Sequence, residues 1–126
     1  MDMMQQVAFI KLAYKRVKEH DSGYPYTIEN VIGVFKSFFA AYESNSGSEH
    51  PWVSLRQLEQ IIKVMPWTEI YGEYITPELY PEIIEEYFQT ELNADYRIYH
   101  FFSGNIRLMR LITLGYSEYY ERTVVE

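Results

Sequence analysis

The stretch IENVIGVFKSFFAAY, residues 28–42, decides the fold of this chain. Its apolar side chains recur every three or four residues, which places them on one continuous face of a helix. Burying each large apolar side chain contributes roughly 1.5–3 kcal/mol before the entropy cost. The hydroxyl of Thr27, just before the stretch, can accept a backbone N–H at a helix start. The pattern therefore predicts a helix over 28–42 at the centre of the core.

Four more helices are predicted on either side of this one. Asp21-Ser22-Gly23 ends the first, Ser54 and Gln57 form a capping box before the third, and Pro66 ends the third. Pro81 suits the start of the fourth, and Gly115 suits the end of the last. The predicted ranges are 2–20, 55–65, 81–92 and 104–114. The chain is therefore expected to be mainly α, a compact single-domain bundle of about five helices over 1–126 with a polar loop at 43–51.

Two segments in the C-terminal half have two interpretations each. Residues 67–80 fit either short strand pieces at 69–71 and 73–75, or a structured loop with a helical turn after Thr76-Pro77. Residues 96–102 fit either a short strand or a buried helical turn, and the tail at 116–126 either a frayed helix or an edge strand. A minor β-hairpin in this half is therefore compatible with the sequence.

Composition excludes several classes of protein. The chain has 126 residues and no cysteine, so disulfide scaffolds, zinc ribbons and thiol catalysis are excluded together. The start at Met1–Gln6 lacks the basic region and apolar run of a secretory signal. No stretch approaches the roughly 20 apolar residues that span a bilayer. We therefore expect a cytoplasmic protein.

The negative charge lies in the second half of the chain. Residues 1–65 hold seven acids and seven bases, whereas residues 66–126 hold eleven acids and four bases. Eight acids and no base lie between Lys63 and Arg97. Such a field repels a phosphate backbone and attracts a basic partner.

Tyrosine is the most over-represented residue type. The chain has 13 tyrosines, and nine of them follow residue 70. Tyrosine is enriched at protein interfaces because it combines a large contact area with few rotatable bonds and a polar tip. The other interpretation is that most tyrosines lie at the rim of a small core with their hydroxyls in water.

No pattern typical of a metal site or an active site is present. His20, His50 and His100 have no ligand spacing, so neither a metal nor a cofactor is expected. His100 is interpreted as a core histidine with a satisfied hydrogen bond rather than a catalytic one. Paired carboxylates are frequent, so a small carboxylate-dependent enzyme remains an alternative.

Positive charge on two predicted helices supports a different alternative. Lys11, Lys15 and Lys18 follow one side of the first helix, and Arg107 and Arg110 are three residues apart on the last. Either group can contact phosphate. A DNA-binding replication or transcription accessory protein is therefore a second hypothesis, although the overall acidity disfavours it.

A resemblance adds to these patterns. His50-Pro51-Trp52, Tyr87-Phe88 and the run DYRIYHFFSG at 95–104 resemble segments of small accessory proteins of phages and mobile elements of low-GC Gram-positive bacteria. The resemblance implies an accessory role, such as a replication helper or an inhibitor of a host defence nuclease.

The combined features favour a protein-binding accessory protein over an enzyme. We expect it to present an acidic, tyrosine-rich surface to a basic nucleic-acid-handling protein, as an anti-defence or anti-CRISPR-like inhibitor or a DNA mimic. Self-association is compatible with this expectation. The expected contact residues are Glu69, Tyr71, Glu73, Tyr74, Glu78, Glu82, Glu85 and Glu86.

Overall fold

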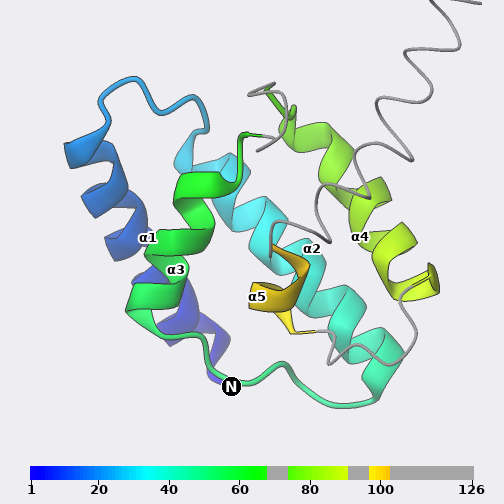
Figure 1. Cartoon of the computed structure of the whole chain (residues 1–126). Helices are drawn as coiled ribbons and strands as arrows, with labels where there is room; N and C mark the ends of the chain where they lie inside the picture. Colours follow the sequence, from blue (N-terminus) through cyan, green and yellow to red (C-terminus); the bar gives the residue numbers. More distant parts are fainter. Residues whose placement is uncertain (68–73, 91–96, 103–126) are drawn as a thin grey trace, which may run out of the picture.

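Helix α2 (Ile28–Ser46) runs through the middle of the molecule, as Figure 1 shows for the computed structural model. The structure describes residues 1–67, 74–90 and 97–102. Helix α1 (Met3–His20) packs against α2 and against α3 (Leu55–Val64), while α4 (Tyr80–Thr90) packs against α2 from another side. The 3-10 turn η1 (Pro77–Leu79) precedes α4, and α5 (Ile98–Phe101) is a single turn. The described part of the chain is helical and holds no strand, which confirms the mainly α prediction.

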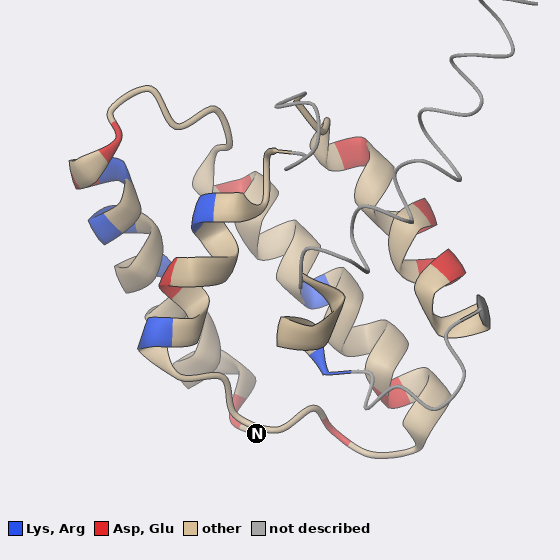
Figure 2. Cartoon of the chain, in the orientation of Figure 1, with Lys and Arg blue, Asp and Glu red and all other residues tan. Residues whose placement is uncertain are grey.

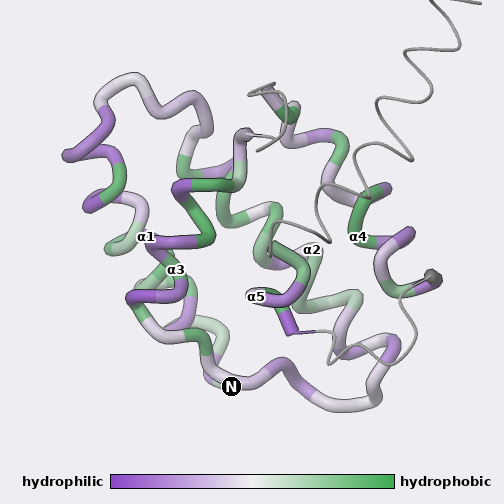
Figure 3. Tube along the Cα trace, in the orientation of Figure 1, coloured by the Kyte–Doolittle hydropathy of each residue, from purple (hydrophilic) through white to green (hydrophobic). Residues whose placement is uncertain are grey.

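The predicted central helix is confirmed as the main source of core side chains. Its buried residues are Val31, Val34, Phe35, Phe38 and Phe39. Hydrophobic residues follow α2, whereas α3 and α4 alternate between hydrophobic and hydrophilic positions (Figure 3). Along α4 the buried positions point to α2, so one helix face forms the core and the other is left for solvent.

The predicted polar loop at 43–51 is wrong for its first four residues. Residues 43–46 continue α2, and the helix ends only at Gly47, which has a φ of 75°. Polar side chains do not stop a helix by themselves, because they remain in water on its exposed face. The Asn45 side chain even donates to the Ala41 carbonyl within the helix. A residue that tolerates the left-handed conformation is what ends it.

The predicted N-caps are confirmed by the hydrogen bonds at the helix starts. The Thr27 hydroxyl accepts from the Asn30 N–H, and the Asn30 side chain accepts from the Thr27 N–H. Ser54 and Gln57 form the same reciprocal pair before α3. These caps satisfy backbone N–H groups that have no partner inside the helix.

The two segments with alternative interpretations contain helical turns where the structure describes them. Residues 77–79 form η1, which runs directly into α4, so α4 begins at Tyr80 and not at Pro81. Residues 98–101 form α5. Trp67 and Tyr74 make one isolated antiparallel bridge, and the residues between 67 and 74 lie outside the described part. The predicted helix at 104–114 and the tail also lie outside it.

Four of the eight tyrosines that the structure describes, Tyr24, Tyr26, Tyr80 and Tyr87, are buried, so for these four the expectation of a hydroxyl in water or at an interface is wrong. Tyr24, Tyr26 and Tyr80 are buried, and their hydroxyls donate to the carbonyls of Ile62, Ile75 and Met65. Each ring fills the core while its hydroxyl satisfies a buried backbone acceptor. These three hydroxyls therefore join segments that are distant in sequence.

Charge is segregated between the two sides of α2. Lysine and arginine gather on α1 and α3, whereas η1 and α4 carry four glutamates and no base (Figure 2). No described helix is both long enough and apolar enough to cross a membrane.

Candidate functional site

The sequence of α4 divides the helix into an apolar face and an acidic face. Ile83, Ile84 and Tyr87 are buried, whereas Glu82 and Glu85 are exposed. Residues three or four apart on a helix share one face, so the buried set and the exposed set lie on opposite sides. The helix therefore places its apolar side in the core and Glu82 and Glu85 outside it.

Three glutamates form one exposed stripe on η1 and α4. Glu78, Glu82 and Glu85 are spaced by four and three residues, and all three are exposed. None forms an ion pair with any residue that the structure describes. The Oε1 atom of Glu85 accepts a hydrogen bond from Gln89 at 3.2 Å, which holds this carboxylate on the outer face. We call Glu78, Glu82 and Glu85 the acidic stripe; Glu86, beside it, is half-buried.

A shallow groove between α2 and α4 runs beside the acidic stripe. It consists of two adjoining hollows of about 240 and 380 Å³, both lined by Ser37 and Pro81. Glu29 and Glu78 line the first hollow, and Glu85 lines the second. Small residues of α2, including Gly33, Ser37 and Ala41, are part of the lining and leave space between the two helices.

The structure brings together only part of the predicted contact set. Tyr74 is 47% exposed and its ring meets Tyr26 and Trp67 edge to face, at centroid distances of 5.9 and 6.1 Å. It precedes η1 and lines neither hollow of the groove. The other predicted residues of this stretch, Glu69, Tyr71 and Glu73, lie outside the described part.

The lysines predicted as phosphate contacts are on the surface of α1. Lys11, Lys15 and Lys18 are all exposed, and the Lys18 ammonium donates to the Tyr24 carbonyl at 3.2 Å. Nearby Arg16 pairs with Glu59 of α3 at 3.1 Å. Arg107 and Arg110 lie outside the described residues. Figure 2 shows that α1, which carries these three lysines, and α4, which carries most of the acidic stripe, lie on opposite sides of α2.

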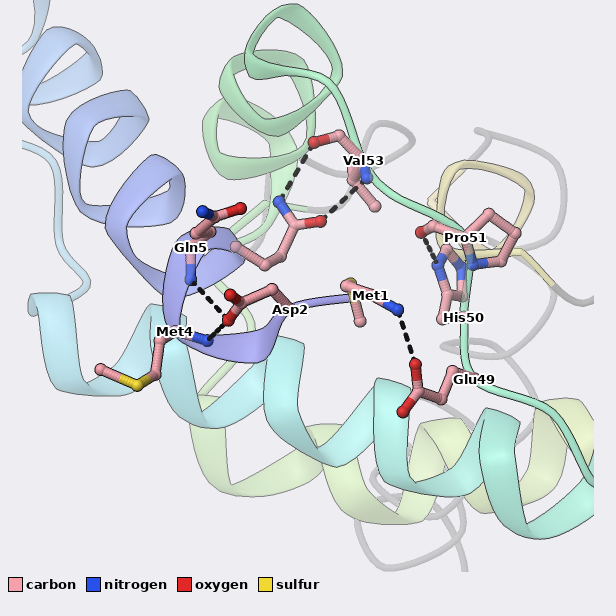
Figure 4. A network of polar contacts seen from close by, with 9 residues as sticks. Met1, Asp2, Met4, Gln5, Glu49, His50, Pro51 and Val53 are labelled. Carbon is pink, nitrogen blue, oxygen red and sulfur yellow. Dashed lines mark hydrogen bonds and ion pairs between the residues drawn. The ribbon is translucent and has the colours of Figure 1, made fainter.

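Two buried polar residues, for which the sequence predicts no structural role, connect the loop after α2 to the helices. The Gln6 amide exchanges two hydrogen bonds with the backbone of Val53, at 2.9 and 3.1 Å. His50 accepts from the Ile98 N–H through Nε2 at 3.0 Å, and its Nδ1 lies 2.7 Å from the Pro51 carbonyl. Figure 4 shows the part of this network around the N-terminus. Neither residue has a sequence signal for burial, because Gln6 follows Gln5 and His50 follows Glu49.

The rings of α2 surround His50. The centroids of Phe39 and Tyr42 lie 5.0 and 4.7 Å from the imidazole, and that of Phe38 lies 5.9 Å away. The imidazole is 4% exposed, and both of its nitrogens have partners. Through these contacts His50 holds the loop after α2, and α5, against α2.

His100 has a satisfied hydrogen bond, as expected, but is only half-buried rather than in the core. Its Nδ1 lies 2.7 Å from the hydroxyl of Tyr87, a fully buried residue of α4. Within the part of the chain that the structure describes, no three histidine or acidic side chains are grouped so that they could hold a metal ion.

Comparison with known proteins adds no family to this description. No family model matches the chain, and neither a curated protein nor a solved structure is similar enough to count as a match.

Proposed function

We propose that this chain is a protein-binding module whose acidic stripe and adjoining groove bind a basic protein segment. The observation that carries the proposal is that Glu78, Glu82 and Glu85 are exposed together without an ion pair to any described residue. Carboxylates arranged in this way attract a cationic surface, and the encounter is faster and more selective than between neutral surfaces.

The groove gives the basic partner a place for its aliphatic side-chain parts. Lysine and arginine have long apolar stems, which pack on weakly polar surface while the charged group reaches a carboxylate. The hollows beside Ser37 and Pro81 offer such surface, and Glu29, Glu78 and Glu85 border them. A segment with several lysines or arginines fits this combination better than a single small cation.

The acidic stripe also spaces its charges on a scale similar to that of a nucleic-acid strand. The eight residues from Glu78 to Glu85 rise about 10 Å along a helix axis and carry three carboxylates, one about every 5 Å. One strand of duplex DNA presents a negative charge about every 3.4 Å. A nucleic-acid-handling protein is therefore the partner class that we favour, with the carboxylates taking the place of phosphates. This partner class agrees with an inhibitor that a phage or mobile element uses against host defence.

The proposal is tested by capture with paired charge variants. The baits are the wild-type chain, Glu82→Gln/Glu85→Gln and the control Glu19→Gln/Glu43→Gln, which removes the same charge from exposed sites outside the groove. A nuclease-treated lysate of the source organism is passed over each. We expect a basic protein to be retained by the wild type and the control and lost by Glu82→Gln/Glu85→Gln. Equal retention by all three baits would contradict the proposal.

The partner class is tested separately with the captured protein in purified form. If the acidic stripe replaces phosphates, duplex DNA and this chain compete for one site, and DNA displaces the chain in a concentration-dependent manner. Simultaneous binding of both would show that the partner's nucleic-acid site is not the target.

A further inference from the structure

A second surface, on α1, combines exposed aromatic and aliphatic side chains with positive charge. Phe9 and Leu12 of α1 and Trp52 of the loop before α3 are 39%, 41% and 43% exposed. The rings of Phe9 and Trp52 meet edge to face with their centroids 5.1 Å apart. We call these three residues the Trp52 patch. Tryptophan is one of the residue types that are enriched at the positions that dominate binding energy in protein interfaces.

The Trp52 patch is held rigidly by the polar network beneath it. Gln6 lies on α1 one turn before Phe9 and is fully buried. Its amide binds both the N–H and the carbonyl of Val53, the residue after Trp52. The indole is therefore held against α1 by Phe9 and by the backbone of its own loop. A surface that is ordered before binding loses less conformational entropy when a partner arrives.

Cations border the patch. Lys15 and Arg16 follow Leu12 by three and four residues, so they lie one helical turn beyond it. Arg16 is bound to Glu59 through one nitrogen only and is about half-exposed, so further guanidinium N–H groups can donate. Lys11 of α1 and Arg56 of α3 are also exposed. This side of the molecule thus has the charge opposite to that of the acidic stripe.

We propose that the Trp52 patch and its cations bind an acidic amphipathic segment of a partner protein. The apolar side chains of such a segment cover Phe9, Leu12 and Trp52, and its carboxylates reach Lys11, Lys15 and Arg16. A single nucleic-acid strand would use the rings and the cations but would leave the aliphatic Leu12 without a matching group. This surface is separate from the acidic stripe, so the two proposals stand or fall independently.

The experiment uses a synthetic 20-residue helical peptide with leucine at every third or fourth position and glutamate at most others. Binding is followed by the anisotropy of a label on the peptide and by Trp52 fluorescence in a Trp67→Phe background. We expect saturable binding that shifts Trp52 emission to the blue. Leu12→Ser and Lys11→Glu/Lys15→Glu each weaken binding at least tenfold. The control pair Lys36→Glu/Lys63→Glu, at exposed sites on α2 and α3, and Glu82→Gln/Glu85→Gln change it less than twofold.

Several results would overturn the proposal. Equal weakening by the two lysine pairs would mean that only net charge matters. Unchanged binding in Leu12→Ser, with circular dichroism showing an intact fold, would exclude the apolar contact. Displacement of the peptide by a 20-nucleotide single strand at lower concentration would identify nucleic acid as the ligand. Sedimentation showing a dimer that Leu12→Ser dissociates would identify a second copy of this chain.

Discussion

The imidazole of His50 accepts a hydrogen bond from the backbone N–H of Ile98, 48 residues later in the chain, with Nε2 and N 3.0 Å apart. Because Nε2 accepts, Nδ1 carries the proton and donates to the Pro51 carbonyl at 2.7 Å. One neutral ring thereby connects the loop after α2 to the N-terminal end of α5. It does so inside a shell of aromatic rings, where an unpaired N–H is costly.

Replacing His50 is therefore expected to destabilise the fold in two separable ways. His50→Phe keeps a ring among the α2 aromatics but leaves the Ile98 N–H without its acceptor, which costs about 1–3 kcal/mol. His50→Ala also opens a cavity, and its total loss is about 2–5 kcal/mol. Urea unfolding measures both values. A Phe variant as stable as the wild type would show that the hydrogen bond contributes nothing.

Gln6→Leu tests the connection between α1 and the loop that carries Trp52. Leucine has nearly the same volume, but it can neither donate to the Val53 carbonyl nor accept from the Val53 N–H. We expect a loss of at least about 2 kcal/mol in the free energy of unfolding, since two buried backbone groups lose their partner. Trp52 should also become more accessible to acrylamide quenching. Unchanged stability together with unchanged quenching would contradict this role.

Replacing Gly33, inside α2, and Gly47, at the end of α2, by alanine should change the free energy of unfolding in opposite directions. Gly47 ends α2 at a φ of 75°, and an added methyl group meets nothing within 4 Å, so the cost of Gly47→Ala is conformational, about 1 kcal/mol. Gly33 lies inside α2, and its added methyl group also meets nothing within 4 Å. Gly33→Ala should therefore stabilise the fold by roughly 0.5–1 kcal/mol. Thermal unfolding of both variants gives the comparison, and equal signs would be inconsistent with the described backbone.

The raised pKa of Tyr24 predicts how the free energy of unfolding changes at alkaline pH. Burial raises the pKa of its hydroxyl above the usual value of 10.0, and the neighbouring Tyr26, Tyr14 and Asp21 act in the same direction. Above about pH 10 the unfolded chain loses this proton while the folded chain keeps it. The contribution of Tyr24 is thus complete below pH 10 and declines as the pH rises further. Tyr24→Phe should lower stability at pH 8 by about 1 kcal/mol, and the variant should lose less than the wild type between pH 8 and pH 11. If the free energies of unfolding of the variant and the wild type fell in parallel between pH 8 and pH 11, this role of Tyr24 would be contradicted.

The features that could be predicted from the sequence are those with a local cause. The apolar spacing of 28–42 predicts α2, and the side chains of Thr27 and Ser54 predict where α2 and α3 begin, because a cap acts within one helical turn. The spacing of Glu82 and Glu85 against Ile83 and Ile84 predicts the two faces of α4 for the same reason.

The features that could not be predicted depend on contacts between distant segments. His50 reaches Ile98, and the hydroxyl of Tyr80 reaches the carbonyl of Met65, only after the chain has folded. Whether a tyrosine is buried or exposed depends on which segments pack against its ring. The spacing of residues along the sequence does not reveal those segments. The groove beside the acidic stripe likewise needs α2 and α4 to be placed together.

The most direct test of the central claim maps where a basic segment contacts the chain. A 15-residue peptide rich in lysine and arginine is titrated into ¹⁵N-labelled protein, and changes in amide chemical shift are followed by NMR. The proposal predicts that the changes concentrate on residues 78–89 and on the facing part of α2 around Ser37, and that salt at about 0.5 M suppresses them. Changes centred on α1, or spread evenly over all exposed acids, would contradict it.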